Sequence, residues 1–150
     1  MNGQFLSTRQ PTFGVEVHPL RYETSHGNVS LNLWDCGGEY QGLIFGYWIQ
    51  ANAAIVLVDL NSQDPLEQAT RWIGELRQHC GNIPIIVCGN KADLTHGNIE
   101  KELYKLDIQY YSISCLSMQG FEEPFIYLLR QLLQEENLQI VGLSHTAKLD

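Results

Sequence analysis

The chain has 150 residues, 44% of them hydrophobic, and a formal net charge of −8 at pH 7. This length fits one domain with a sizeable core, and the apolar fraction excludes disorder as a description of the whole chain. An acidic chain without a basic run is a poor nucleic-acid binder, and no apolar stretch approaches the roughly 20 residues that span a bilayer. We therefore expect one globular domain that has neither DNA nor a membrane as its partner.

The four cysteines, at positions 36, 80, 88 and 115, form no C-x-x-C pair. This spacing argues against a metal framework or a disulfide lattice and favours a reducing intracellular setting. The first ten residues contain no apolar signal core, and the last four, AKLD, offer no cysteine for lipid attachment. These features predict an intracellular protein without a lipid anchor.

Residues 15–22 alternate between apolar and polar side chains and are rich in strand-forming types. A turn signal, His26-Gly27-Asn28, follows them, and residues 29–34 alternate again. Two alternating runs around a turn of this composition predict an antiparallel hairpin.

Two later runs, residues 54–58 and 83–88, are almost continuously apolar and rich in β-branched side chains. Such runs are typical of strands buried on both faces, as in a parallel sheet. Between them we predict a helix that has Asp64 as its cap, Pro65 at its first position and Gly81 at its end.

The rest of the pattern predicts a short helix at 99–106, a strand at 109–113 and a last helix at 121–134. Alternating strands and helices imply an α/β sheet with right-handed crossovers, in which ligands bind beyond the carboxyl ends of the strands. In this chain those ends are residues 59–60, 89–93 and 114–116.

The sharpest chemical signal is Gly89-Asn90-Lys91-Ala92-Asp93, where a buried strand ends. The Asp93 carboxylate can accept two hydrogen bonds from the N1–H and N2–H₂ edge of guanine, which adenine lacks, and the wrong base would leave it unpaired. Asn90 can tie neighbouring loops together, and the stem of Lys91 can lie over the ring plane. The alternative is an ordinary turn with a solvated lysine and aspartate.

Three weaker signals accompany it. Asp35, at the end of a strand and before two glycines, can hold a water on Mg²⁺, and the glycines let a backbone N–H approach a phosphate. The Thr12 hydroxyl is a possible Mg²⁺ ligand, and the backbone of Ser114 and Cys115 can meet a base carbonyl. Each of these, taken alone, also fits a loop without a ligand.

In this order and spacing the four signals resemble the small GTPase superfamily. Further stretches resemble its Ran-type branch, the GTPases of nucleocytoplasmic transport, and the resemblance runs from about residue 3 to residue 141. The matching stretches are 14–20 (GVEVHPL), 46–51 (GYWIQA), 82–85 (NIPI), 88–91 (CGNK), 109–111 (QYY) and 121–125 (FEEPF).

The resemblance implies an α/β fold of the small-GTPase-like (P-loop NTPase) type, a mostly parallel sheet with flanking helices. We expect a GTPase domain over residues 1–141, incomplete at its N-terminus, and a C-terminal tail over 142–150. By comparison with the family, its first strand, phosphate loop and most of its first helix are absent. The strand at 29–34 would then lose its usual neighbour, so it either closes up on the strand at 54–58 or the gap is filled in another way.

The resemblance also assigns roles by position. It implies that Thr12 and Asp35 hold Mg²⁺, the former directly and the latter through water, and it assigns no catalytic residue. The nucleotide-binding set, from the residue packed on the base edge to the loop that backs the base, comprises Phe5, Thr12, Gly38, Asn90, Lys91, Asp93, Ser114, Cys115 and Leu116. In this set Asn90, Lys91 and Asp93 would recognise guanine, and Gly38 would sense the γ-phosphate.

Three departures from the family pattern follow, and two of them concern the phosphates. The printed sequence contains no G-x-x-x-x-G-K-[ST] loop, whose amides and lysine hold the β- and γ-phosphates. Gly38 is followed by Glu39, where the family has the glutamine that orients the attacking water. The loop at 114–116 reads Ser-Cys-Leu in place of Ser-Ala-Lys. We therefore expect impaired phosphate binding and hydrolysis.

Three interpretations follow. The first is a Ran-like GTP-binding protein with GTP or GDP and Mg²⁺ as cofactors, importin- and exportin-type receptors and Ran regulators as partners, and a location in nucleus and cytoplasm. The second is a nucleotide-free pseudo-GTPase that acts as an interaction module or decoy for transport receptors. The third is a truncated product of a full-length Ran-like gene.

Overall fold

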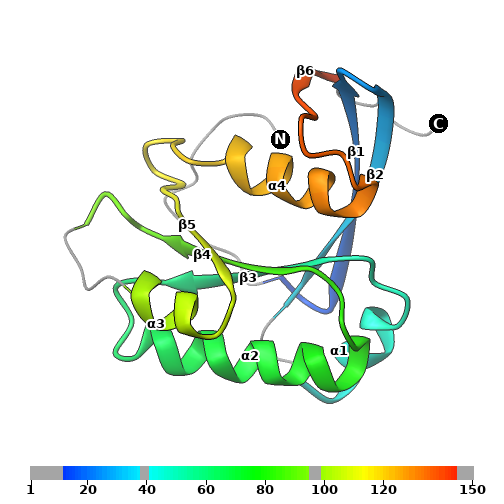
Figure 1. Cartoon of the computed structure of the whole chain (residues 1–150). Helices are drawn as coiled ribbons and strands as arrows, with labels where there is room; N and C mark the ends of the chain where they lie inside the picture. Colours follow the sequence, from blue (N-terminus) through cyan, green and yellow to red (C-terminus); the bar gives the residue numbers. More distant parts are fainter. Residues whose placement is uncertain (1–11, 38–40, 95–98, 145–150) are drawn as a thin grey trace.

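The computed structural model describes residues 12–37, 41–94 and 99–144 (Figure 1). Its elements, in chain order, are β1 (Val15–Thr24), β2 (Gly27–Cys36), α1 (Gln41–Trp48), β3 (Ala54–Asp59), α2 (Pro65–Cys80), β4 (Ile85–Asn90), α3 (Glu100–Lys105), β5 (Gln109–Ser112), α4 (Glu122–Leu133) and β6 (Ile140–Ser144).

The predicted α/β architecture is confirmed. Strands β3, β4 and β5 form a parallel sheet in that order, with α2 and α3 on one face and α4 on the other (Figure 1). The core under α2 and α3 is made by side chains such as Val58, Leu76 and Leu103, whereas Ile86 and Leu128 belong to the core under α4. Strand β4 is buried over five of its six residues, which explains its unbroken apolar sequence.

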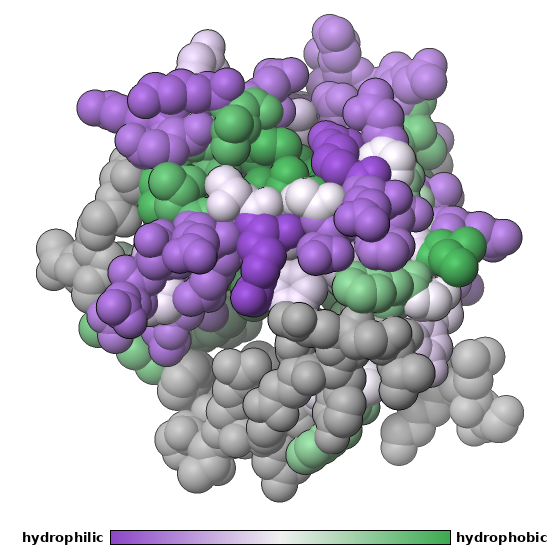
Figure 2. Space-filling model, turned by 90° about the horizontal axis from the view of Figure 1, so that it is seen from below, coloured by the Kyte–Doolittle hydropathy of each residue, from purple (hydrophilic) through white to green (hydrophobic). Residues whose placement is uncertain are grey.

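Helix α2 begins and ends where its sequence predicts. The Asp64 carboxylate accepts a hydrogen bond from the N–H of Glu67 at 2.9 Å, Pro65 is the first helical residue, and Gly81 ends the helix with φ +69°. Figure 2 views the molecule from the side of this helix and shows a largely hydrophilic surface with smaller hydrophobic areas. The helix is amphipathic: Ala69 and Leu76 on its apolar side are buried in the core that it shares with β3.

The predicted hairpin is also confirmed, with its turn placed one residue earlier than expected. Strands β1 and β2 pair antiparallel over their whole length, and Ser25 and His26 form the turn between Thr24 and Gly27. The Thr24 hydroxyl donates to the carbonyl of Gly27 at 2.6 Å and accepts from the N–H of His26 at 3.2 Å. These bonds satisfy polar groups inside the turn and fix the hairpin register.

Helix α1 was not predicted from the sequence. Its rings join it to α2: Phe45 stacks on His79 with centroids 4.2 Å apart, and Trp48 meets Trp72 edge-on at 6.0 Å. The Cys80 thiol donates to the carbonyl of Trp48 at 3.5 Å. This helix has no marked apolar stripe, so tertiary contacts with α2 hold it.

The hairpin belongs to a second sheet, separate from the parallel one. Within the described residues β2 and β3 do not pair, and β2, β1 and β6 form their own antiparallel sheet. Strand β6 was not predicted and crosses the expected boundary at residue 141. Of the two alternatives that the sequence left open, the structure excludes the one in which β2 and β3 close up on each other. Leu57 of β3 is 57% exposed.

Candidate functional site

The carboxyl ends of the parallel strands bring the predicted base-recognition residues together. Asp59 lies opposite Asn90 in the β3–β4 register, and Gly89 lies opposite Ser112 in the β4–β5 register. The ladder continues past the strand ends, because Leu60 N–H donates to the Asn90 carbonyl at 3.1 Å and Ile113 N–H donates to the Gly89 carbonyl at 2.8 Å. The three following loops therefore start from one rigid edge.

Asn90 joins two of those loops. Its side-chain oxygen accepts one hydrogen bond from the N–H of Lys91 at 2.8 Å and another from the N–H of Cys115 at 3.1 Å. Lys91 has φ +66°, a backbone conformation that is uncommon for a lysine, and the hydrogen bond that its N–H donates to Asn90 helps to hold it there. The predicted role of Asn90 as a tie between loops thus matches its contacts.

Asp93 and Ser114 form the second link. The Ser114 hydroxyl, 2% exposed as a residue, donates to one carboxylate oxygen of Asp93 and accepts from the N–H of Ser117 at 3.1 Å. The N–H of Ala92 donates to the carbonyl of Ile113 at 3.1 Å. A buried hydroxyl therefore orients the carboxylate of Asp93, which is itself exposed to solvent.

Lys91 is paired with a residue that sequence reasoning left out of the site. Its ammonium lies 2.5 Å from a carboxylate oxygen of Asp59, whose other oxygen accepts from the N–H of Asn61 at 2.9 Å. The one available signal was that Asp59 directly follows a buried apolar run. Sequence alone places both residues at the sheet edge but does not pair them.

The two predicted Mg²⁺ ligands also lie together. The Thr12 hydroxyl donates to a carboxylate oxygen of Asp35 at 3.1 Å, where the chain enters β1 and leaves β2. Gly37 lies beside them: its N–H donates to the carbonyl of Gly14 at 2.9 Å. A hydroxyl and a carboxylate are the oxygen donors that a hard cation prefers, so this pair fits Mg²⁺.

The Cys36 thiol, next to the Thr12–Asp35 pair, does not add a sulfur ligand to it. Burial raises the pKa of the Cys36 thiol, and the neighbouring charge of Asp35 adds to the rise, although a hydrogen bond with Trp48 opposes it. A protonated thiol is a poor metal ligand, so the donors at this point remain oxygen atoms. Among the residues with described positions, no group of three or more His, Cys, Asp or Glu side chains gathers into a metal centre.

The remaining site predictions divide into two groups. Leu116 is 57% exposed on the loop after β5, next to Cys115, which is half-buried. Phe5 and Gly38, for which a base contact and a phosphate contact are predicted, lie outside the described residues.

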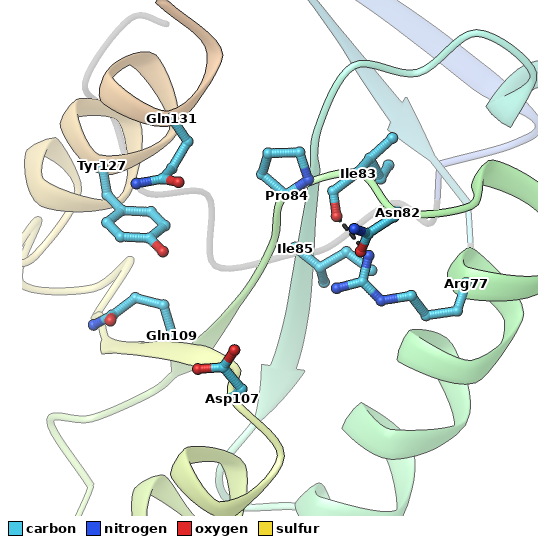
Figure 3. Close-up of a pocket in the computed structure, with 9 residues that line it drawn as sticks. All are labelled: Arg77, Asn82, Ile83, Pro84, Ile85, Asp107, Gln109, Tyr127 and Gln131. Atoms are coloured by element: carbon cyan, nitrogen blue, oxygen red, sulfur yellow. Dashed lines mark hydrogen bonds between the residues drawn. The ribbon is translucent and has the colours of Figure 1, made fainter. Parts of the chain in front are cut away.

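A separate pocket of about 230 Å³ lies at the opposite end of the parallel sheet (Figure 3). Arg77, Asp107 and Tyr127 are among the residues that line it, but the Arg77 guanidinium donates to the carbonyl of Ile83 at 2.6 Å and to that of Gly81 at 3.3 Å. The backbone therefore already engages this cation, and the pocket is distinct from the candidate site.

The comparison with known proteins agrees with this geometry. The model of the Ras family matches residues 1–134, which is most of the chain. In the part of the chain that the structure describes, no helix is long and apolar enough to cross a membrane.

Proposed function

Because the chain belongs to the Ras family of small GTPases, we propose that it is a guanine-nucleotide-binding switch domain of the Ran type. Members of this family generally bind GTP or GDP with Mg²⁺. The observation that carries the proposal is the constellation at the carboxyl edge of the parallel sheet, in which Asn90 ties the loops and Ser114 orients Asp93.

Base selection follows from the orientation of Asp93. One of its oxygens is held by the Ser114 hydroxyl, so the carboxylate plane is set before a ligand arrives. A carboxylate held in this way accepts from the paired N1–H and N2–H₂ donors of guanine. Adenine cannot supply this pair, which makes Asp93 the specificity-determining residue of the proposed site.

The Thr12–Asp35 pair would hold Mg²⁺, the hydroxyl as a direct ligand and the carboxylate through water. The ion supplies charge neutralisation at the phosphates when it is bound. Glu39 follows Gly38, where the family pattern has the glutamine that orients the attacking water, so we propose little hydrolysis.

The Ran-type assignment is supported by stretches such as 14–20 and 46–51, and by exposed aromatic surface near the second of these. The Trp34 and Tyr47 rings lie 6.1 Å apart, and these residues are 47% and 52% exposed. Aromatic side chains are enriched at protein interfaces, so we propose that this patch contacts importin- or exportin-type receptors, in the nucleus and cytoplasm.

The nucleotide part of the proposal is tested by isothermal titration of the chain with GDP and Mg²⁺, with ADP as the comparison ligand. We expect binding of GDP and none of ADP. The Asp93→Asn variant should lose GDP affinity and gain affinity for xanthosine diphosphate, because the amide can donate to the xanthine oxygen.

The control is Asp107→Asn, which removes a carboxylate near the opposite end of the sheet and should leave both affinities unchanged. Undetectable GDP binding at micromolar protein would favour the pseudo-GTPase interpretation. GDP binding with an unchanged base preference in Asp93→Asn would remove the role assigned to this residue.

The receptor part is tested with purified importin-β-type receptor and the Tyr47→Ala variant. We expect the unaltered chain to bind and Tyr47→Ala to bind at least several-fold more weakly. The Tyr47 ring is half-exposed, and the methyl group of alanine cannot supply the contacts that this ring would make with a receptor. The Tyr104→Ala variant, which removes an 83% exposed ring from α3, should bind as the unaltered chain does.

A further inference from the structure

Lys91, in the segment 90–93 that we propose recognises the base, is held both at its backbone and at the tip of its side chain. At its backbone, the N–H of Lys91 donates to the side-chain oxygen of Asn90 and φ is +66°. At its tip, the ammonium lies 2.5 Å from a carboxylate oxygen of Asp59. Because β3 and β4 are neighbouring strands, the lysine stem crosses from the end of β4 to the end of β3.

The carboxylate at the tip is itself held. The second oxygen of Asp59 accepts from the N–H of Asn61 at 2.9 Å, within the turn that follows β3. Asp59 therefore presents its other oxygen in a fixed direction, toward Lys91. A long lysine side chain loses considerable rotamer freedom when it is ordered, and here that ordering precedes ligand binding.

We infer that Asp59 is a positioning residue that holds the Lys91 stem ready for the guanine ring, and that it sets nucleotide affinity without selecting the base. The inference rests on the proposed function. The aliphatic stem provides an apolar surface for a ring plane, while Asp93, two residues further along the same loop, would accept hydrogen bonds from the edge of the base. Replacing Asp59 should free the Lys91 stem. It should leave the side-chain hydrogen bonds of Asn90 and Asp93 intact, because those bonds go to Cys115 and Ser114 and do not involve the Asp59 side chain.

The contribution to folding should be small. The Lys91 and Asp59 side chains are 48% and 38% exposed, and exposed ion pairs contribute little to stability. A positioning role therefore predicts a loss of affinity with little change in melting temperature, whereas a structural role predicts that both change together.

The experiment is a double-mutant cycle read by titration with GDP and Mg²⁺, using Asp59→Asn, Lys91→Ala and the double variant. Asparagine keeps the acceptor for Asn61 and removes the charge. We expect Asp59→Asn to weaken GDP binding roughly 10-fold through the freed lysine, with the preference for GDP over xanthosine diphosphate unchanged. In the Lys91→Ala background the same change should have no further effect.

Independent additive losses, or an unchanged affinity in Asp59→Asn while the unaltered chain binds GDP, would overturn this inference and leave the proposed function standing. No binding by the unaltered chain would overturn both. A second measurement needs no nucleotide: acetylation of Lys91 by an amine-reactive ester, followed by mass spectrometry, should be faster in Asp59→Asn. Acetylation of Lys101 and Lys105 in the same samples should be unchanged, and an equal Lys91 rate would show that the pair does not hold the lysine.

Discussion

At the scale of single residues, Gly37 controls how closely the segment at Thr12 approaches the end of β2. A Cβ added at Gly37 would lie 2.0 Å from the carbonyl oxygen of Thr12, which no real Cβ tolerates. The obstacle is backbone, so a side-chain rotation cannot relieve it. The absence of a side chain at Gly37 therefore permits the Thr12–Asp35 contact on which the proposed Mg²⁺ site depends.

The Gly37→Ala variant should push Thr12 away from Asp35 and destabilise the fold by about 1–3 kcal/mol through the steric clash. If the chain binds GDP, the enhancement of binding by Mg²⁺ over EDTA should shrink as well. Urea unfolding and titration measure the two effects. The matched control is Gly74→Ala in α2, where an added Cβ meets nothing within 4 Å and improves helix propensity.

Two buried titratable groups make stability fall at high pH. Burial raises the pKa of Tyr22 and that of Cys88, each to about 12, from ordinary values of 10.0 and 9.0. The folded state therefore keeps protons that the unfolded state has released. The resulting stability is fully present below pH 9 and is lost progressively as pH rises from 9 toward 12.

Urea unfolding at pH 8, 9.5 and 11 should therefore show decreasing free energy of unfolding, with a slope of up to about 1.4 kcal/mol per pH unit for each group. The Tyr22→Phe variant removes one of these groups and should show a shallower decline between pH 10 and 11. An identical decline in the variant would mean that Tyr22 ionises normally in the folded protein.

At the scale of elements, α2 illustrates how local chemistry determines boundaries. Its cap, its first-position proline and its closing glycine all lie where the sequence predicts, because each acts through bonds or dihedral angles within a few residues. Helix α1 and strand β6 have no such local signal. They are held by rings on α2 and by pairing with β1, which lies more than a hundred residues before β6.

The Asp64→Ala variant should lower the free energy of unfolding by about 1 kcal/mol, because the N–H of Glu67 loses its acceptor. The Asp64→Asn variant retains an acceptor oxygen and should be close to the unaltered chain. Circular dichroism during urea unfolding measures both. Equal losses in the two variants would attribute the effect to charge instead of capping.

At the scale of the molecule, α4 joins the two sheets. Its neighbouring residues Leu128 and Leu129 belong to different cores. Leu128 packs with Ile86 in the core between α4 and the parallel sheet, and Leu129 packs with Tyr22 of the hairpin sheet. The Arg130 guanidinium adds a hydrogen bond to the carbonyl of Leu138 at 2.9 Å. Since β2 and β3 do not pair in the described structure, this helix is a principal link between the two sheets.

Truncating either leucine to alanine should cost about 2–5 kcal/mol, because each is almost fully buried. The location of the loss should differ. Leu129→Ala should accelerate amide hydrogen exchange mainly in β1, β2 and β6, and Leu128→Ala mainly in β4 and β5. A uniform acceleration in both variants would show that the two sheets unfold as one unit.

The sequence alone determined the features that depend on near neighbours: the hairpin, the buried parallel strands, the α2 caps and the Asn90–Asp93 motif at a strand end. Tertiary structure alone decided that Asp59 pairs with Lys91, that Ser114 orients Asp93, that the strands form two sheets and that α4 connects them. The reason is physical. Caps, turns and hydrophobic periodicity arise from interactions within a few residues, whereas these contacts join segments that only the folded chain brings within hydrogen-bonding or packing distance.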